Sequence, residues 1–154
     1  MPNKLTIRSA GQDDLPSVLQ LYGQLNPGDK TISPADGARI LQKFSSYPGS
    51  AIYIGFRGDE AVSTCALVVV PNLTRGGAPY ALIENVVTEA RHRKRGYGKA
   101  VIAQAISAAW KHNCYKIMLL TGSKDPATLT FYGDIGFEQS KVGFQIRHIA
   151  PRKG

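Results

Sequence analysis

The chain has 154 residues, 43% of them hydrophobic, and 19 lysines and arginines against 11 aspartates and glutamates give it a net charge of +8. This length suits one domain over residues 1–154, and no apolar run is long enough to cross a bilayer. The N-terminus lacks a hydrophobic signal segment, so we expect a cytoplasmic protein. The positive charge indicates an anionic partner or only solubility, and nucleic acid, a membrane surface and a phosphorylated small molecule all fit it.

The N-terminal third shows one strand pattern and two helix patterns. Residues 4–10 alternate apolar and polar like a strand, and residues 12–25 carry apolar residues at helical spacing. Ser33 and Pro34 are typical of a helix start, and we expect that helix to run to about Tyr47.

The rest of the chain alternates mainly between strands and helices. Gly58 and Asp59 predict a hairpin turn between two strands. The expected elements are strands at 51–57, 60–70, 80–88, 115–121 and 142–149, and helices from Gly98 and over 127–135. This order predicts an α+β protein with a mixed central sheet.

Two cysteines, Cys65 and Cys114, lie in apolar stretches of the sequence. They are typical of buried free thiols rather than of a disulfide framework. Neither belongs to a Cys-x-x-Cys pair, and the three histidines are scattered, so no metal site is expected.

The stretch from Arg91 to Ala100, RHRKRGYGKA, places four cations directly before two glycines and an apolar helix. A helix start presents unpaired N–H groups and the positive end of the helix dipole. Glycines there let an anion approach the backbone, so residues 93–98 suit a pyrophosphate. The P-loop pattern is absent, and Val101 stands where the dinucleotide fingerprint needs glycine or alanine.

Arg93-x-x-Gly96-x-Gly98, after a strand and opening a helix, resembles the acetyl-CoA loop of the GNAT superfamily of N-acetyltransferases. FYGDIGF (131–137) matches a second motif of that family, and IRSAGQDDLPSVLQLY is similar to its usual first strand and helix. IENVVT, CYKIMLLT and FQIRH are similar, in the same order, to segments of glucosamine-phosphate N-acetyltransferases. The resemblance covers nearly the whole chain.

This resemblance implies the GNAT fold, a mixed and mostly antiparallel sheet with helices on both faces. It implies direct acetyl transfer from acetyl-CoA to the primary amine of a small molecule within a ternary complex, by a homodimer, with no nucleic acid or membrane partner. Glu84 would remove the amine's proton and Tyr132 would protonate the leaving thiolate. The expected cofactor contacts are Val86, Val87, Arg93, Lys94, Arg95, Gly96, Tyr97, Gly98, Lys99 and Thr128. The expected substrate contacts are Glu84, Asn85 and Arg147.

Simpler interpretations stay open for these residues. The basic stretch is also typical of a solvated loop or a nucleic-acid patch, and Tyr132 of a core aromatic beside Phe131. Glu84 and Asn85 are expected on opposite faces of a central strand, where one would point to solvent. The acceptor stays open between an aminosugar phosphate, an amino acid, a polyamine, an antibiotic and a protein N-terminus. A CoA-binding or nucleic-acid-binding protein without turnover is the alternative to an enzyme.

Overall fold

The computed structural model describes residues 4–151. The chain forms two compact units, one up to Leu119 and one from Leu120 onward. Among the described residues, no helix combines the length and the apolar character that a bilayer crossing needs.

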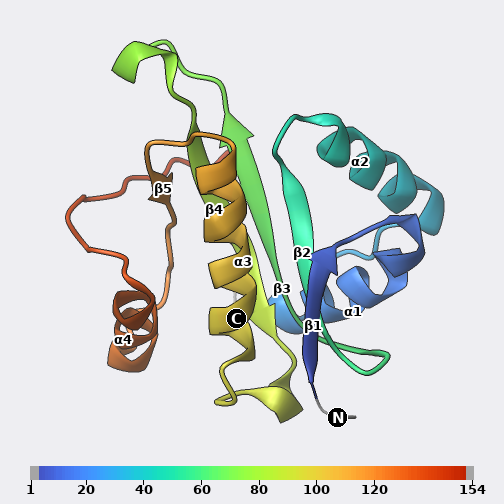
Figure 1. The fold of residues 1–154 in the computed structure, drawn as a ribbon. Helices are drawn as coiled ribbons and strands as arrows, with labels where there is room; N and C mark the ends of the chain where they lie inside the picture. The colour runs from blue at the N-terminus through green and yellow to red at the C-terminus, as the bar shows by residue number, and fades with distance from the viewer. Residues whose placement is uncertain (1–3, 152–154) are drawn as a thin grey trace. The chain divides into compact units, whose positions relative to one another are not determined.

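The first unit is built on a five-stranded sheet in the order β1-β2-β3-β4-β5 (Figure 1). All neighbours are antiparallel except β4 and β5, which are parallel. The strands are β1 (Leu5–Ser9), β2 (Ala51–Arg57), β3 (Glu60–Val70), β4 (Tyr80–Thr88) and β5 (Ile117–Met118). This confirms the mixed, mostly antiparallel sheet of an α+β protein.

Three α-helices belong to this unit, and α3 covers the sheet face turned to the viewer in Figure 1 while α1 lies behind the strands. They are α1 (Leu15–Leu25), α2 (Pro34–Ser46) and α3 (Tyr97–Lys111). Short 3-10 turns are η1 (Gln12–Asp14), η2 (Arg75–Gly77) and η3 (Ala90–His92). The predicted N-cap is confirmed, because the Ser33 side chain accepts a hydrogen bond from the Asp36 amide at 3.1 Å.

The core lies where these helices meet the central strands, because each element turns one apolar face inward. Its largest fully buried apolar side chains are Val18, Leu21, Ile54, Val62, Leu67, Ile83, Val101 and Ile102. Cys65 and Cys114 are free and buried, as their apolar surroundings in the sequence predict.

The predicted strand 115–121 is much shorter in the structure. Only Ile117 and Met118 form β5, opposite Ala81 and Leu82 of β4. An apolar run shows that a segment is buried, but a strand continues only as far as a neighbour runs beside it. Beyond Leu82, the side of β4 that faces away from β3 has no paired strand among the described residues.

The second unit contains one regular element within its described residues, α4 (Pro126–Ile135). Gly136 ends this helix in a left-handed conformation with φ 117°, where glycine is favoured. The predicted strand 142–149 is wrong, since no strand forms there. Its alternation defines an apolar face, but a strand also needs a partner for its backbone hydrogen bonds, and this unit has no other strand among the described residues.

Candidate active site

β4 carries a bulge at the predicted substrate residues. Thr64 pairs with Val87 and Ala66 with Glu84, so two β4 residues, Asn85 and Val86, lie opposite Cys65. Asn85 has φ 53°, a left-handed conformation that asparagine tolerates better than most residues. The bulge interrupts the regular period of two directly after Glu84, and Glu84 and Asn85 are both exposed, so more than one of the two residues faces solvent.

The main chain after the bulge runs along the edge that β5 leaves unpaired. Val86 is half-buried and Val87 is buried. The Val87 carbonyl accepts a hydrogen bond from the Ser63 hydroxyl at 3.2 Å, on the β3 side. An unpaired strand edge can bind an extended, amide-containing chain by backbone hydrogen bonds.

Two groups that sequence reasoning did not connect lie at the bulge. The Tyr22 hydroxyl, from α1, is buried and makes no hydrogen bond of ordinary geometry to any described residue. Burial raises the pKa of Tyr22 to about 12, and the nearby Asn85 side chain offsets part of that rise. Burial also raises the pKa of the Cys65 thiol to about 12, so this cysteine is a protonated thiol at neutral pH and a poor nucleophile.

The basic glycine loop, residues 93–99, leads from η3 into α3. Gly96 caps α3 with φ 82°, and Lys94 also has a left-handed φ of 62°. A Cβ built on Gly96 would meet no atom within 4 Å, so the backbone here is open. The next N–H groups, from Tyr97 to Lys99, begin the helix and have no acceptor within it. Open N–H groups at a helix start can bind an anion.

The cations around this loop are not equivalent. Arg91 is held by carboxylates, with Nη2 3.0 Å from Glu60 and Nε 3.1 Å from Glu89. Arg93 donates from Nε to the Thr88 carbonyl at 3.3 Å, which leaves its two terminal nitrogens available. The side chains of the other cations of the loop, Lys94, Arg95 and Lys99, are exposed. The loop therefore presents several cations beside the open backbone.

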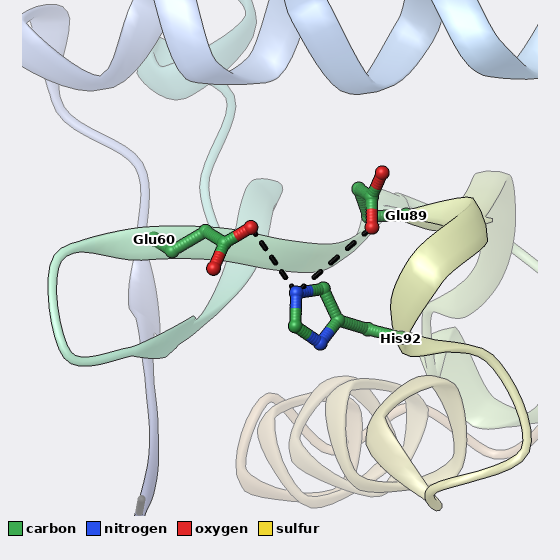
Figure 2. Close-up of side chains that lie close together, drawn as sticks. All are labelled: Glu60, Glu89 and His92. Carbon is green, nitrogen blue, oxygen red and sulfur yellow. Dashed lines mark hydrogen bonds and ion pairs between the residues drawn. The ribbon is translucent and has the colours of Figure 1, made fainter. Parts of the chain in front are cut away.

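Glu60, Glu89 and His92 form a cluster beside this loop (Figure 2). Nε2 of His92 lies 3.1 Å from Glu60 and 3.9 Å from Glu89, and one ligand atom from each residue lies within 4.8 Å of the others. Sequence reasoning missed this cluster because Glu60 is far from Glu89 and His92 in the chain and the three residues form no spacing motif. These residue types can bind a metal ion, but the guanidinium of Arg91 already contacts both carboxylates and would repel a second cation.

The second unit holds the other predicted residues. Asp125 caps α4 by accepting a hydrogen bond from the Ala127 amide at 3.0 Å, and the Thr128 hydroxyl lies 3.1 Å from that of Ser123. Tyr132, one turn after Thr128, is half-buried between two aromatic rings. The ring centroids of Phe131 and Phe137 lie 5.0 and 6.2 Å from that of Tyr132, both edge-on. Arg147 is exposed outside any strand.

The family of the chain follows from comparison with known proteins. The family model described as "Acetyltransferase (GNAT) family" matches residues 15–137. The chain belongs to this family. It is accordingly an acetyl-CoA-dependent enzyme that transfers an acetyl group to an amine, and both the GNAT fold and the family expected from the sequence are confirmed.

Three relatives illustrate the range of this GNAT protein's similarities. A curated protein of Trypanosoma brucei brucei, named glucosamine 6-phosphate N-acetyltransferase, is 30% identical over 142 residues, which are 86% of this chain and 88% of that protein. The structure of a putative acetyltransferase from Agrobacterium tumefaciens is 46% identical with a TM-score of 0.88, over 93% of this chain and 99% of the other. The structure of the glucosamine-6-phosphate N-acetyltransferase of Arabidopsis thaliana is 19% identical with a TM-score of 0.85, over 95% of this chain and 99% of the other. At this low identity, the similarity supports the shared fold alone.

Proposed function

We propose that this GNAT protein acetylates the amine of an aminosugar phosphate. The observation that carries the proposal is the 30% identity with the Trypanosoma protein named as a glucosamine 6-phosphate N-acetyltransferase, over most of both chains. The net charge of +8 also suits an acceptor and a donor that are both anionic.

In this proposal the acetyl-CoA pyrophosphate binds at the basic glycine loop. The open backbone at Gly96 and the N–H groups of Tyr97, Gly98 and Lys99 surround the anion, and the side chains of Arg93, Lys94 and Arg95 neutralise it. Main-chain groups of Val86 and Val87, on the unpaired edge of β4, bind the pantetheine arm. Thr128 adds a hydroxyl contact from α4.

Chemistry takes place next to the β4 bulge. Glu84, whose side chain is exposed at the bulge, removes a proton from the substrate ammonium, directly or through water. The amine then attacks the thioester while both substrates are bound, which makes the attack effectively unimolecular. Backbone N–H groups of β4 polarise the thioester carbonyl, and Tyr132 protonates the departing thiolate. Asn85 and Arg147 are the further acceptor contacts in this proposal.

We also propose a homodimer that meets through residues 142–149. Three alternate side chains of this stretch, Val142, Phe144 and Ile146, are 82%, 90% and 99% exposed, and within the described part of the second unit no strand pairs with them. A second copy of the chain would supply both an apolar surface and a backbone partner. We expect light scattering to give a dimer and Phe144→Glu to give a monomer; a monomeric wild type at assay concentration would remove this claim.

The two cysteines support a proposal for the cell compartment. Two buried, unpaired thiols suit a reducing environment, so we propose a cytoplasmic enzyme.

The deciding experiment is thiol release from acetyl-CoA with a panel of amines. The panel contains glucosamine 6-phosphate, unphosphorylated glucosamine, a polyamine, an amino acid and an aminoglycoside. We expect the highest kcat/KM with the phosphorylated sugar. Equal rates with both glucosamines would contradict the phosphate specificity, and binding of acetyl-CoA without thiol release from any amine would favour a CoA-binding protein without turnover.

A further inference from the structure

The turn between β4 and the basic glycine loop is held by a side chain from α1. Gln24 donates a hydrogen bond from its Nε2 to Glu89 Oε1 at 3.3 Å. Its own Oε1 accepts a hydrogen bond from the Ala90 amide at 2.9 Å. The Glu89 amide donates in turn to the Val62 carbonyl of β3 at 2.8 Å. Two elements that are distant in the sequence, α1 and β3, therefore fix the start of η3.

Glu89 and Arg91 then connect this turn to the β2–β3 hairpin. Glu89 is 9% exposed and accepts from the Arg91 amide at 2.8 Å and from Arg91 Nε at 3.1 Å. Burial by itself raises the pKa of Glu89, but hydrogen bonds from Arg91 and Gln24 outweigh burial and hold the pKa below its usual value. Arg91 also donates from Nη2 to Glu60 Oε1 at 3.0 Å, so the guanidinium joins two carboxylates from different segments.

His92 extends the same chain of contacts to the basic glycine loop. Nδ1 of His92 lies 3.4 Å from Arg95 Nη1, and Nε2 lies 3.1 Å from Glu60 Oε1. An arginine can only donate, so Nδ1 accepts and the proton of the neutral ring is on Nε2, which donates to Glu60. His92 is 8% exposed, which keeps its ring in place between the hairpin and the loop.

We propose that Glu60 is a positioning residue for the cofactor: through His92 and Arg91 it holds Arg95 and the turn before the basic glycine loop in the arrangement that binds the CoA pyrophosphate. This inference rests on the proposed binding of the pyrophosphate at that loop. A loop that is already ordered loses less conformational freedom on binding, so its affinity for the ligand is higher. Glu60 lies outside every acetyl-CoA motif in the sequence, and only the fold brings it here.

The experiment compares Glu60→Ala with Asp59→Ala. The two residues are neighbours that line the same hollow of about 250 Å³, and each substitution leaves 10 acidic residues against 19 basic ones, a net charge of +9. Any general attraction of anionic CoA therefore changes equally. We expect Glu60→Ala to raise the Kd of CoA by calorimetry and the KM of acetyl-CoA about fivefold, with kcat unchanged, and Asp59→Ala to stay within about twofold of wild type.

Glu60→Gln tests the contacts rather than the charge. Its amide oxygen can still accept from His92 and Arg91, so its Kd should lie between those of wild type and Glu60→Ala. Equal CoA affinity in Glu60→Ala and Asp59→Ala would overturn the inference, as would a fall in kcat without a rise in KM. Failure of the wild type to bind CoA would instead contradict the proposed function of the loop, so the two failures are distinct.

Discussion

Glu84 stands on the exposed side of β4, one residue before the left-handed Asn85. Glu84 directly precedes the bulge, where the regular alternation of the strand is interrupted. A side chain in this position is accessible to an amine, whereas a buried carboxylate on a regular central strand would not be.

Replacing Glu84 by glutamine should therefore lower turnover most at low pH. An ammonium cannot attack until it loses its proton, so a base contributes most where the amine is charged, by a factor on the order of 10² to 10⁴. The loss should shrink as pH rises and free amine becomes abundant. The measurement is the pH–rate profile of wild type and Glu84→Gln with one good amine; a uniform loss at every pH would mean that Glu84 positions the substrate.

Tyr132 acts at the other end of the proposed reaction, on the departing thiolate. A thiol with a pKa of about 8.5 is a fairly good leaving group. We therefore expect Tyr132→Phe to cost a factor on the order of 10² in kcat, with acetyl-CoA affinity nearly intact because the proposed phosphate site is the basic glycine loop. Pre-steady-state rates of CoA release measure this effect. Full turnover in the variant would make Tyr132 an aromatic packing residue beside Phe131 and Phe137.

Cys65 lies opposite the bulge, yet its environment argues against covalent catalysis. The thiol is fully buried and its pKa is raised to about 12 by burial, so it forms no thiolate at neutral pH. Cys65→Ala should keep kcat within about threefold of wild type, since the side chain only packs. Initial rates should give intersecting double-reciprocal lines. Parallel lines together with a trapped acetyl-cysteine would contradict direct transfer.

At the scale of elements, the start of α3 depends on a glycine in a left-handed conformation. Gly96→Ala keeps the open space above the loop but places a Cβ at φ 82°. We expect a loss of about 1–2 kcal/mol in the free energy of unfolding, and weaker CoA binding if the loop shifts to relieve the strain. Urea unfolding and calorimetry measure the two quantities.

Gly23→Ala is the matched control for this change. Gly23 lies within α1, has no positive φ and also has free space around a built Cβ. Alanine there should stabilise the protein by about 0.5–1 kcal/mol without changing CoA affinity. Opposite signs of the two stability changes are expected, and equal signs would contradict the proposed strain at Gly96.

At the scale of the whole molecule, acid should weaken the tie between β1 and the first helix. Arg8 donates two hydrogen bonds to Asp14, at 2.6 and 2.8 Å, and these hold the pKa of Asp14 below its usual value. A lowered pKa stabilises the fold fully above the ordinary value of about 3.9, and this contribution is lost as pH falls below it.

Asp14→Asn removes that contribution at every pH. The difference in Tm between wild type and Asp14→Asn should therefore be largest near neutral pH and shrink below about pH 3.9. Asp13→Asn is the control, because Asp13 is exposed and makes no ion pair among the described residues. A Tm difference for Asp14→Asn that does not depend on pH would contradict the role of its charge.

The sequence alone predicted the elements whose signals are local. The hairpin of β2 and β3, the strand β4, the cap at Ser33 and the stop at Gly136 agree with the structure because each depends on a few neighbouring residues. The glycine loop before α3 and the two buried thiols belong to the same class. Family membership also followed from the sequence, since the motifs that carry it are short and lie in a recognisable order.

Only the tertiary structure decided the features that join distant residues. The bulge at Asn85, the buried Tyr22 hydroxyl beside it and the short β5 depend on how neighbouring strands and helices meet. Glu60 holds Arg91 in an ion pair, which separates this arginine from the available cations of the loop. No local motif connects Glu60 to the loop. Periodicity shows which face of a segment is apolar, whereas strand pairing and ion pairing depend on groups that the fold brings together from far apart in the chain. For the same reason, the alternating residues 142–149 form no strand within the described part of their own unit.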